Sequence, residues 1–419
     1  MLNPKTNTRE LAYVVNIDAI EPILGSDNCE CAIVGGWHVM VRKNEFKAGD
    51  PAIYFEIDSY LDPSNSAFSF MEKKKYKVKT QRYTFGGKGN FISQGLLMSA
   101  ANFKWTICKK NNDNLTDIIV GIVDDKDCYH WTNNESRFLT KQLGVTYAVP
   151  EDNTRKVASA DKYKKIAQRH GKLFSHQPFK WLMKRNWGKK LLFVFFGRKK
   201  DKRNSWPSWV TKTDEERIQN MPWILENKEP WIATEKIDGT STTFTLKRGK
   251  WPHKDEFYVC SRNVCFDKPD KTCFYETNVY QEMAEKYNIF NKMKNMLDNL
   301  FSDCEWITIQ GETYGPGIQK RDYHVPEHAF MAFNFITSKD GRWGTKEMVY
   351  LLQTHNGIPC VPIVDDNFIL PDTVEELLNY ATAESVCDHD LREGIVFRSK
   401  DGSKSFKAVS NEFLLKYHQ

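Results

Sequence analysis

Several features of exported, zinc-binding and membrane proteins are missing from this sequence. None of the ten cysteines forms a CxxC pair, and the spacings of Cys29 with Cys31 and of Cys260 with Cys265 do not fit a zinc ribbon. The first ten residues, MLNPKTNTRE, lack the basic and then apolar order of a signal peptide. The apolar run LLFVFF at residues 191–196 is too short to span a bilayer. We therefore expect reduced thiols in a soluble, intracellular protein, with the cytoplasm as its compartment and no membrane contact.

A strong excess of one charge is also missing. The formal net charge is +6 and the isoelectric point is about 8.6. This mildly basic balance permits a polyanionic partner without requiring one. The 419 residues are 40% hydrophobic, which is enough for more than one buried core. Two domains and a connector are therefore expected, and no internal repeat changes that expectation.

The local pattern divides the chain into three parts. Residues 1–150 hold short β-like runs between glycine, aspartate and proline turns, which predicts a small barrel or sandwich. Residues 151–215 are expected to form a helical, basic connector, with a polar helix at 156–171. Residues 216–419 alternate strand-like and helix-like stretches, which predicts an α+β domain of largely antiparallel strands. The strands expected there are 232–235, 241–246, 307–310, 330–336 and 394–398, and the helices are 280–300 and 373–382.

The segment TEKIDG at residues 234–239 places one amine beside a carboxylate and a glycine. The amine of Lys236 can attack phosphorus only when it is unprotonated, so its usual pKa of about 10.4 would have to fall. A metal ion, other basic groups and partial burial all lower a lysine pKa. Gly239 would let the backbone turn tightly, and Asp238 could orient metal-bound water. The alternative is a strand-end lysine in an ordinary hairpin, and these residues alone do not decide between the two.

Further charged residues follow in order along the chain. Arg262 ends one expected strand, Glu312 lies on another, Glu393 precedes a third, and Lys407 lies in a last apolar stretch. Each alone also fits a surface or strand-end residue, and the aromatics of the apolar strand 330–336 also fit a core. Together they supply a nucleophilic amine, acids and cations for phosphates. This combination suits metal-assisted nucleotidyl transfer.

The ordered set KIDG, CSRN, QGETYG, FMAFN, EGIVFR and FKAVS resembles the nucleotidyltransferase motifs of the covalent ligase and capping-enzyme superfamily. The sequence of these motifs is most similar to that of ATP-dependent RNA ligases, over roughly residues 205–419. In addition, GWHVMVRKNEFKAGDPAIYFEIDSYL and ISQGLLM resemble the OB-fold domain that precedes the ligase domain in one RNA ligase group. The resemblance implies an N-terminal OB-fold β-barrel that binds nucleic acid, the connector, and a C-terminal ATP-grasp-like nucleotidyltransferase domain of antiparallel sheets with helices.

The resemblance also implies chemical roles. Lys236 would attack the α-phosphorus of ATP and release pyrophosphate, leaving a lysyl-AMP phosphoramidate. Asp238, Glu312 and Glu393 would hold a hydrated Mg²⁺ or Mn²⁺ at the α-phosphate, with Glu312 also close to the ribose. Lys407 would contact the α-phosphate.

The remaining nucleotide contacts follow in the same way. Arg262 would contact the ribose or an RNA phosphate, and Glu235 belongs to the implied nucleotide-binding set. Phe333 would stack on adenine, with Phe330 as the second choice.

Two positions depart from the family pattern. Many relatives carry Lys-x-Lys in the last motif, but Ser405 occupies the earlier position here. Lys404 could substitute, or one phosphate contact could be missing. Asn334 replaces the aspartate that is common after the stacking aromatic, which leaves its role open.

The resemblance implies that the partners are RNA ends or a nicked duplex. The protein is expected to be a monomer. AMP would pass to an RNA 5′-phosphate, and a 3′-hydroxyl would then displace it. The basic and aromatic segment 181–203 could follow the RNA backbone, or it could be a linker with solvated charges. A second basic cluster could also contact RNA, or it could be the tip of a hairpin. This cluster comprises Lys73, Lys74, Lys75, Lys77, Lys79 and Arg82.

The OB fold could bind the 3′-hydroxyl side of a nick. Four histidines show no metal spacing and are interpreted as structural: His324, His328, His355 and His389.

Three functions compete at this point. The first is an ATP-dependent RNA ligase acting in RNA repair. The second is an mRNA guanylyltransferase or DNA ligase, which usually carries its OB domain after the catalytic domain, whereas only twelve residues follow Lys407 here. The third is an inactive nucleic-acid-binding protein, against which the intact Lys236, Glu312, Glu393 and Lys407 argue.

Overall fold

The computed structural model describes residues 1–3, 6–87, 89–103, 105–109, 118–123, 129–131, 137–147, 176, 181, 185, 206–212, 214–250, 252–266 and 278–417. The expected helix at 156–171, the run 191–196 and most of segment 181–203 lie outside these residues. The chain groups into two compact units, Met1–Tyr147 with Ser205–Gln419, and Ala148–Asn204. The domain boundaries expected from the sequence stay predictions.

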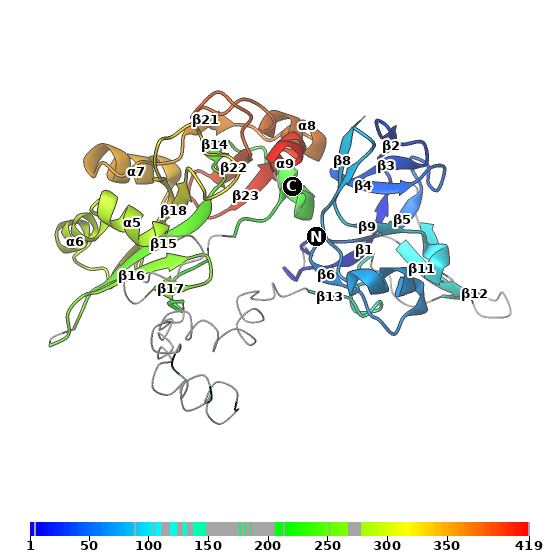
Figure 1. Ribbon diagram of the computed structural model, residues 1–419, viewed down its shortest axis with the longest axis horizontal. Helices are drawn as coiled ribbons and strands as arrows, with labels where there is room; N and C mark the ends of the chain where they lie inside the picture. The colour runs from blue at the N-terminus through cyan, green and yellow to red at the C-terminus, as the bar shows by residue number, and fades with distance from the viewer. Residues whose placement is uncertain are drawn as a thin grey trace. The chain divides into compact units, whose positions relative to one another are not determined.

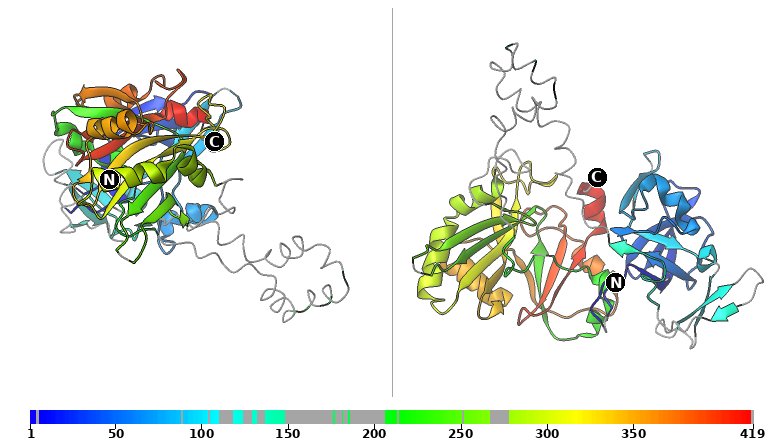
Figure 2. Two further views of the ribbon diagram at one scale, coloured as in Figure 1. Left: turned by 90° about the vertical axis from the view of Figure 1, so that its left-hand side faces the viewer. Right: turned by 90° about the horizontal axis from the view of Figure 1, so that it is seen from below.

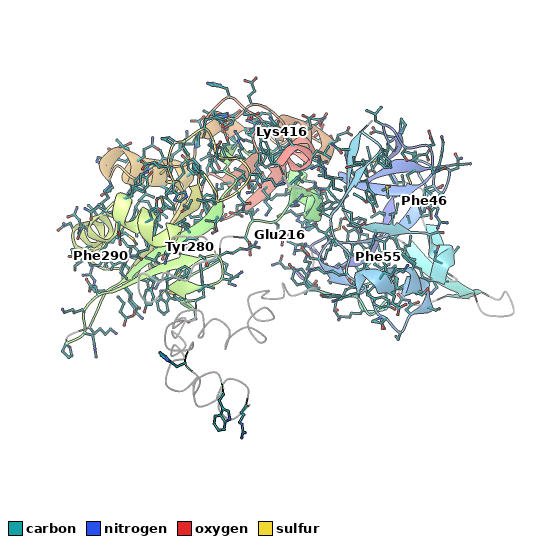
Figure 3. The ribbon with its side chains drawn as sticks, viewed as in Figure 1. Phe46, Phe55, Glu216, Tyr280, Phe290 and Lys416 are labelled. Carbon is teal, nitrogen blue, oxygen red and sulfur yellow. The ribbon has the colours of Figure 1, made fainter. Side chains whose placement is uncertain are left out.

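The N-terminal part is built around the three-stranded sheet β1-β5-β9, formed by Ala12–Asn16, Pro51–Phe55 and Leu96–Met98 (Figure 1). Successive side chains of a strand point to opposite faces, and both faces of β5 are buried. Ile53 and Phe55 enter one core, whereas Ala52 and Tyr54 enter another. Figure 3 labels Phe55 of the first core and Phe46 of the second. Burial on both sides explains why this strand is an unbroken apolar run.

The other described N-terminal elements surround these cores. Further sheets are β2-β3-β4 (Ala19–Pro22, Cys29–Val34, Trp37–Arg42), β6 with β13 (Ser59–Tyr60, Thr146–Tyr147), β7 with β8 (Gln81–Thr84, Asn90–Ser93) and β10-β11-β12 (Trp105–Lys109, Ile118–Val123, Tyr129–Trp131). The short helices are η1 (Ser66–Lys74) and η2 (Ala100–Phe103).

The C-terminal part contains two antiparallel sheets, as the sequence predicts. The six-stranded sheet has the order β17-β16-β15-β18-β19-β20, formed by Cys265–Phe266, Glu256–Ser261, Thr240–Lys247, Trp306–Tyr314, Ala329–Thr337 and Gly341–Arg342. The four-stranded sheet has the order β21-β14-β22-β23, formed by Ile363–Phe368, Trp231–Lys236, Gly394–Ser399 and Ser405–Val409.

Helices cover one face of each sheet (Figures 1 and 2). Helices α5 (Val279–Lys286) and α6 (Ile289–Asn299) pack on the six-stranded sheet, and α8 (Val374–Ala381) packs on the four-stranded sheet. The remaining helices are η3 (Ile218–Asn220), η4 (Pro222–Glu226), α7 (Thr345–Val349), η5 (Tyr350–His355) and α9 (Asn411–Tyr417).

The expected single helix over residues 280–300 is wrong. Two helices occupy this stretch, and they are separated at Tyr287 and Asn288. Asn288 has φ 49°, in the left-handed region that asparagine tolerates better than most residues. The break lets apolar residues of both helices reach one core, including Met283 of α5 and Met293 of α6.

The turn between β14 and β15 connects the two sheets. Lys236 ends β14 opposite Gly394, while Thr240 begins β15 and Ser241 lies opposite Glu312. A Cβ at Gly239 would lie 2.3 Å from the carbonyl oxygen of Thr313, so only glycine fits this close approach. The register therefore brings the lysine of one sheet toward the acids of both.

Two absences expected from the sequence concern the described residues only. Within them, no helix is long and apolar enough to cross a membrane. The seven cysteines whose side chains are described are free thiols: Cys29, Cys31, Cys260, Cys265, Cys304, Cys360 and Cys387.

The capping box of α8 gives a test of the fold. The Thr373 hydroxyl accepts the backbone N–H of Glu376 at 3.2 Å, and the Glu376 carboxylate accepts the N–H of Thr373 at 3.3 Å. We expect Thr373→Ala to lower the free energy of unfolding by about 1 kcal/mol in urea denaturation, because it removes this acceptor. Thr373→Ser keeps the hydroxyl and should stay close to wild type. An equal loss in both variants would contradict the capping role.

Candidate active site

The turn between β14 and β15 lies at a cavity of about 340 Å³. Both sheets contribute to its wall, together with the segment that precedes η3. The lining residues are Asp214, Glu215, Thr234, Glu235, Lys236, Ile237, Gly239, Thr240, Ser241, Arg262, Glu312, Gln319, Phe333, Val361, Val396, Arg398 and Lys407. Of the residues expected from the sequence, the cavity therefore gathers Glu235, Lys236, Arg262, Glu312, Phe333 and Lys407.

Lys236 forms an ion pair at the end of β14. Its Nζ lies 2.7 Å from Oε2 of Glu393, and the two side chains are 24% and 9% exposed. Burial by itself lowers the pKa of Lys236, but the carboxylates of Glu393 and Glu312 raise the pKa further than burial lowers it. The net pKa of Lys236 is therefore above its ordinary value. The reason is that the acids expected to hold a metal act directly on the ammonium in this structure.

Three carboxyl groups influence this one amine. Burial raises the pKa of Glu312 to about 8; Lys236 opposes this shift, whereas the charges of Glu393 and Asp238 add to it. Asp238 is buried, and its backbone N–H donates to the hydroxyl of Tyr323. Within the described residues, no group of three His, Cys, Asp or Glu side chains is arranged to hold a metal ion by itself. The acids are thus close enough to interact through charge, but they are not grouped as a protein-only metal cage.

Two further cations face the cavity. Burial lowers the pKa of Lys407 to about 8, and the charges of Lys236 and Arg217 lower it further. Lys407 lies on β23 opposite Val396, which also lines the cavity. Arg262 follows β16, is 61% exposed, and forms an ion pair of 2.7 Å with Asp214. These positive charges suit a phosphate-bearing ligand.

A bulge in β19 places the expected stacking aromatic at the cavity. Gln310 of β18 lies opposite Asn334, and Gly311 lies opposite Ala332, so Phe333 is an extra residue in its strand. Phe333 lines the cavity. Phe330 is fully buried against Phe244 in the core of the six-stranded sheet, with ring centroids 5.2 Å apart. The second choice, Phe330, is therefore unavailable for stacking on a ligand, because the core occupies its faces.

The structure also bears on the two departures from the family pattern. Lys404 is exposed and lines a different hollow, beside Glu226 and Asn227, so it does not replace the missing lysine at this cavity. The Ser405 hydroxyl donates to Glu215 at 2.5 Å. Asn334 is buried, and its Nδ2 donates to Oε1 of Gln310 at 3.0 Å.

Two residues at the cavity have interactions that the sequence motifs did not indicate. Arg398 is buried on β22, donates to the Thr234 hydroxyl at 3.0 Å, and lies with its guanidinium 5.9 Å from the ring centroid of Phe333. Burial lowers the pKa of Arg398 to about 10. The sequence feature that could have indicated Arg398 is an arginine inside the otherwise apolar strand GIVFRS. The Glu235 carboxylate accepts from the Ser385 hydroxyl at 2.5 Å and from the N–H of Val386 at 2.7 Å, which ties β14 to that turn.

Comparisons with known proteins show which families and folds the chain resembles. Residues 229–418 match the RNA ligase family, and residues 11–100 match an OB-fold domain family. No curated protein matches the chain. Solved structures of an RNA ligase from Naegleria gruberi match nearly all of it. Its complex with AMP and Mn is 25% identical, covers 98% of this chain and 99% of that chain, and has a TM-score of 0.61.

Two further structures of the same Naegleria gruberi enzyme give a similar result. The complex with ATP and Mn has 25% identity, coverage of 98% and 99%, and a TM-score of 0.61. The complex with PPi has 25% identity, coverage of 98% and 99%, and a TM-score of 0.58. The chain thus combines an N-terminal OB-fold domain with a ligase domain of the covalent nucleotidyltransferases. Residues 229–418 therefore form a domain of the RNA ligase family, which confirms the enzyme class expected from the sequence, and the structural match over nearly the whole chain confirms the fold.

The pKa of Glu312 predicts a pH-dependent stability in a buffer that contains a metal chelator. Its folded value of about 8 lies above its ordinary value of 4.5, so the folded state keeps a proton that the unfolded chain loses. This contribution is complete below pH 4.5 and is lost as the pH rises toward 8. Glu312→Gln removes the titration, so its stability relative to wild type should improve by about 3 kcal/mol between pH 5 and pH 8. Urea denaturation at both pH values measures this, with exposed Glu285→Gln as control, and an unchanged difference would refute it.

Proposed function

We propose that this RNA ligase is ATP-dependent and joins RNA 3′-hydroxyl and 5′-phosphate ends in RNA repair, through lysyl-AMP at Lys236 and an adenylylated RNA 5′ end. One observation carries the proposal. A single lysine, ion-paired to Glu393, lies at a cavity to which Arg262, Arg398 and Lys407 contribute cationic side chains and Phe333 an aromatic ring. The Naegleria gruberi ligase, which shares this fold, has been solved with ATP, AMP and PPi.

The first step is nucleophilic substitution at the α-phosphorus of ATP. The Lys236 amine, once deprotonated, forms the N–P bond while the bond to the bridging oxygen breaks and pyrophosphate leaves with the electron pair. Lys407 is the cation that would stabilise the α-phosphate charge, because its buried ammonium loses less of its field to water. Arg262 can turn from Asp214 to the nucleotide, since that ion pair is exposed and weak.

The residues present fit a hydrated divalent cation. Burial and the neighbouring carboxylates raise the pKa of Glu312, so a positive charge near Asp238, Glu312 and Glu393 would relieve their repulsion. Because these acids form no cage of their own, Mg²⁺ or Mn²⁺ would be held with water and the nucleotide phosphates. Such an ion supplies charge neutralisation at the phosphates and lowers the pKa of the attacking amine.

The nucleoside would occupy the side of the cavity where Phe333 lies. The β19 bulge turns this ring toward the cavity, and a base can stack on the ring face. Arg398 would rigidify this wall, because its hydrogen bond to Thr234 links β22 to β14 behind the ring.

The later steps require bound RNA. The 5′-phosphate attacks lysyl-AMP and takes the AMP, and the 3′-hydroxyl then displaces AMP and forms the phosphodiester. We assign RNA contact to the basic cluster at the end of η1, where Lys73, Lys74 and Lys75 are exposed next to Phe70, which is 56% exposed. Exposed cations beside an aromatic ring suit the backbone and bases of RNA.

Lys236→Ala should abolish capture of AMP, because no other group replaces the nucleophile. The chain is incubated with ATP labelled at the α-phosphate and Mg²⁺ or Mn²⁺, and acid-labile protein-bound label is then measured on a denaturing gel. Lys236→Arg, which keeps the charge, should also fail, whereas exposed Lys339→Ala should match wild type. Mass spectrometry of the purified chain shows whether it already carries AMP. Labelling of Lys236→Ala, or labelling of wild type by GTP instead of ATP, would contradict the proposal.

Replacing Lys73, Lys74 and Lys75 together by alanine should impair sealing but not lysyl-AMP formation. We expect sealing of nicked RNA to fall about tenfold near physiological salt, with a weaker dependence on salt concentration, because up to three phosphate contacts are lost. The matched control is the triple alanine variant of three other exposed lysines, Lys43, Lys47 and Lys141. Equal sealing by the two triple variants would exclude this surface.

A further inference from the structure

The peptide that follows Lys236 is held by a side chain from the connection between two strands of the other sheet. The backbone N–H of Asp238 is buried and donates to the Tyr323 hydroxyl at 2.6 Å. Tyr323 lies in the connection between β18 and β19. The same connection supplies Gln319, whose side chain donates to the carbonyl oxygen of Gly239 at 3.0 Å. The Asp238 N–H and the Gly239 carbonyl oxygen are therefore both bound by this one segment, and a buried N–H requires such a partner.

The backbone that carries Tyr323 has an unfavourable conformation. Tyr323 has φ 55° and His324 has φ 51°, in the left-handed region that bulky side chains rarely adopt. The turn is closed locally, because the Asp322 carboxylate accepts the N–H of His324 at 3.0 Å. Such conformations persist only where surrounding contacts impose them, and they occur often at functional sites. Here the consequence is a phenol directed into the interior, where it is only 3% exposed.

Arg321 connects this tyrosine to the other half of the ion pair. Its guanidinium lies 4.1 Å from the ring centroid of Tyr323. It also donates to the Asp388 carboxylate and to the carbonyl oxygen of Leu391, in the segment that leads directly to Glu393. Arg321 and Tyr323 thus bind both chain segments that carry the partners of the ion pair. Because both residues are buried, these contacts exclude water and hold one geometry.

We propose that Tyr323 is a positioning residue for transfer of AMP to Lys236. Its hydroxyl fixes the turn that orients Lys236 and Asp238, and Arg321 fixes that hydroxyl relative to Glu393. This inference rests on the proposed function. Tyr323 does not line the cavity, so it acts on the rate of the chemical step and not on nucleotide binding.

The test compares Tyr323→Phe with Tyr314→Phe in the full chain. The two tyrosines are in ring contact, with centroids 5.1 Å apart, and both are buried. Of these two tyrosines, Tyr323 is the one whose hydroxyl accepts the N–H of Asp238 in the turn. We expect Tyr323→Phe to lower the rate constant of lysyl-AMP formation about 10- to 100-fold, because small misplacements of reacting groups have effects of this size. The KM for ATP should change less than about threefold, and Tyr314→Phe should stay within about threefold of wild type in both constants.

Amide exchange provides a second measurement, and its first part uses the wild-type protein alone. In wild type the Asp238 N–H should exchange slowly, and Tyr323→Phe but not Tyr314→Phe should accelerate it. Fast exchange in wild type, equal rates of AMP transfer in the two variants, or a rise in KM alone would each overturn the inference. Failure of wild type to form lysyl-AMP would instead overturn the proposed function, and the exchange measurement would still decide whether Tyr323 holds the turn.

Discussion

The ion pair between Lys236 and Glu393 is the interaction on which the site depends. It joins the last residue of β14 to the residue that precedes β22, and these two strands are neighbours in one sheet. The turn after Lys236 then passes to the other sheet, where Glu312 lies on β18. A single amine is therefore surrounded by acids from both sheets. In this arrangement the charges of the carboxylates keep the pKa of the amine above its ordinary value.

The rest of the ligase domain can be understood as support for that geometry. Helices on each sheet fix the strands, and the β19 bulge turns Phe333 toward the cavity while Phe330 and Phe335 remain in the core. The buried Arg398 is tolerated because its guanidinium donates to Thr234 and lies close to the Glu215 carboxylate. Polar groups at this depth cost folding free energy, and their concentration around one cavity is typical of a catalytic site.

The connection between β18 and β19 links the chemistry to the fold. Its contacts reach the turn after Lys236 through Tyr323 and the segment before Glu393 through Arg321. Left-handed conformations at Tyr323 and His324 accompany these contacts. Local strain, buried hydrogen bonds and the position of Lys236 are thus parts of one arrangement.

The sequence by itself determined the strands, the order of the motifs, the enzyme class and the OB fold before the ligase domain, because these depend on local periodicity and short patterns. It did not determine the break at Asn288, which depends on how α5 and α6 share a core with the six-stranded sheet. Only the tertiary structure decided that Lys404 lies away from the cavity, that Phe330 is in the core, and that Arg398 stands behind Phe333. It also decided the direction of the Lys236 pKa shift, because residues 236, 312 and 393 are far apart in the chain: β14 and β22 must pair before Glu393 lies beside Lys236, and the second sheet must be in place before Glu312 adds its charge.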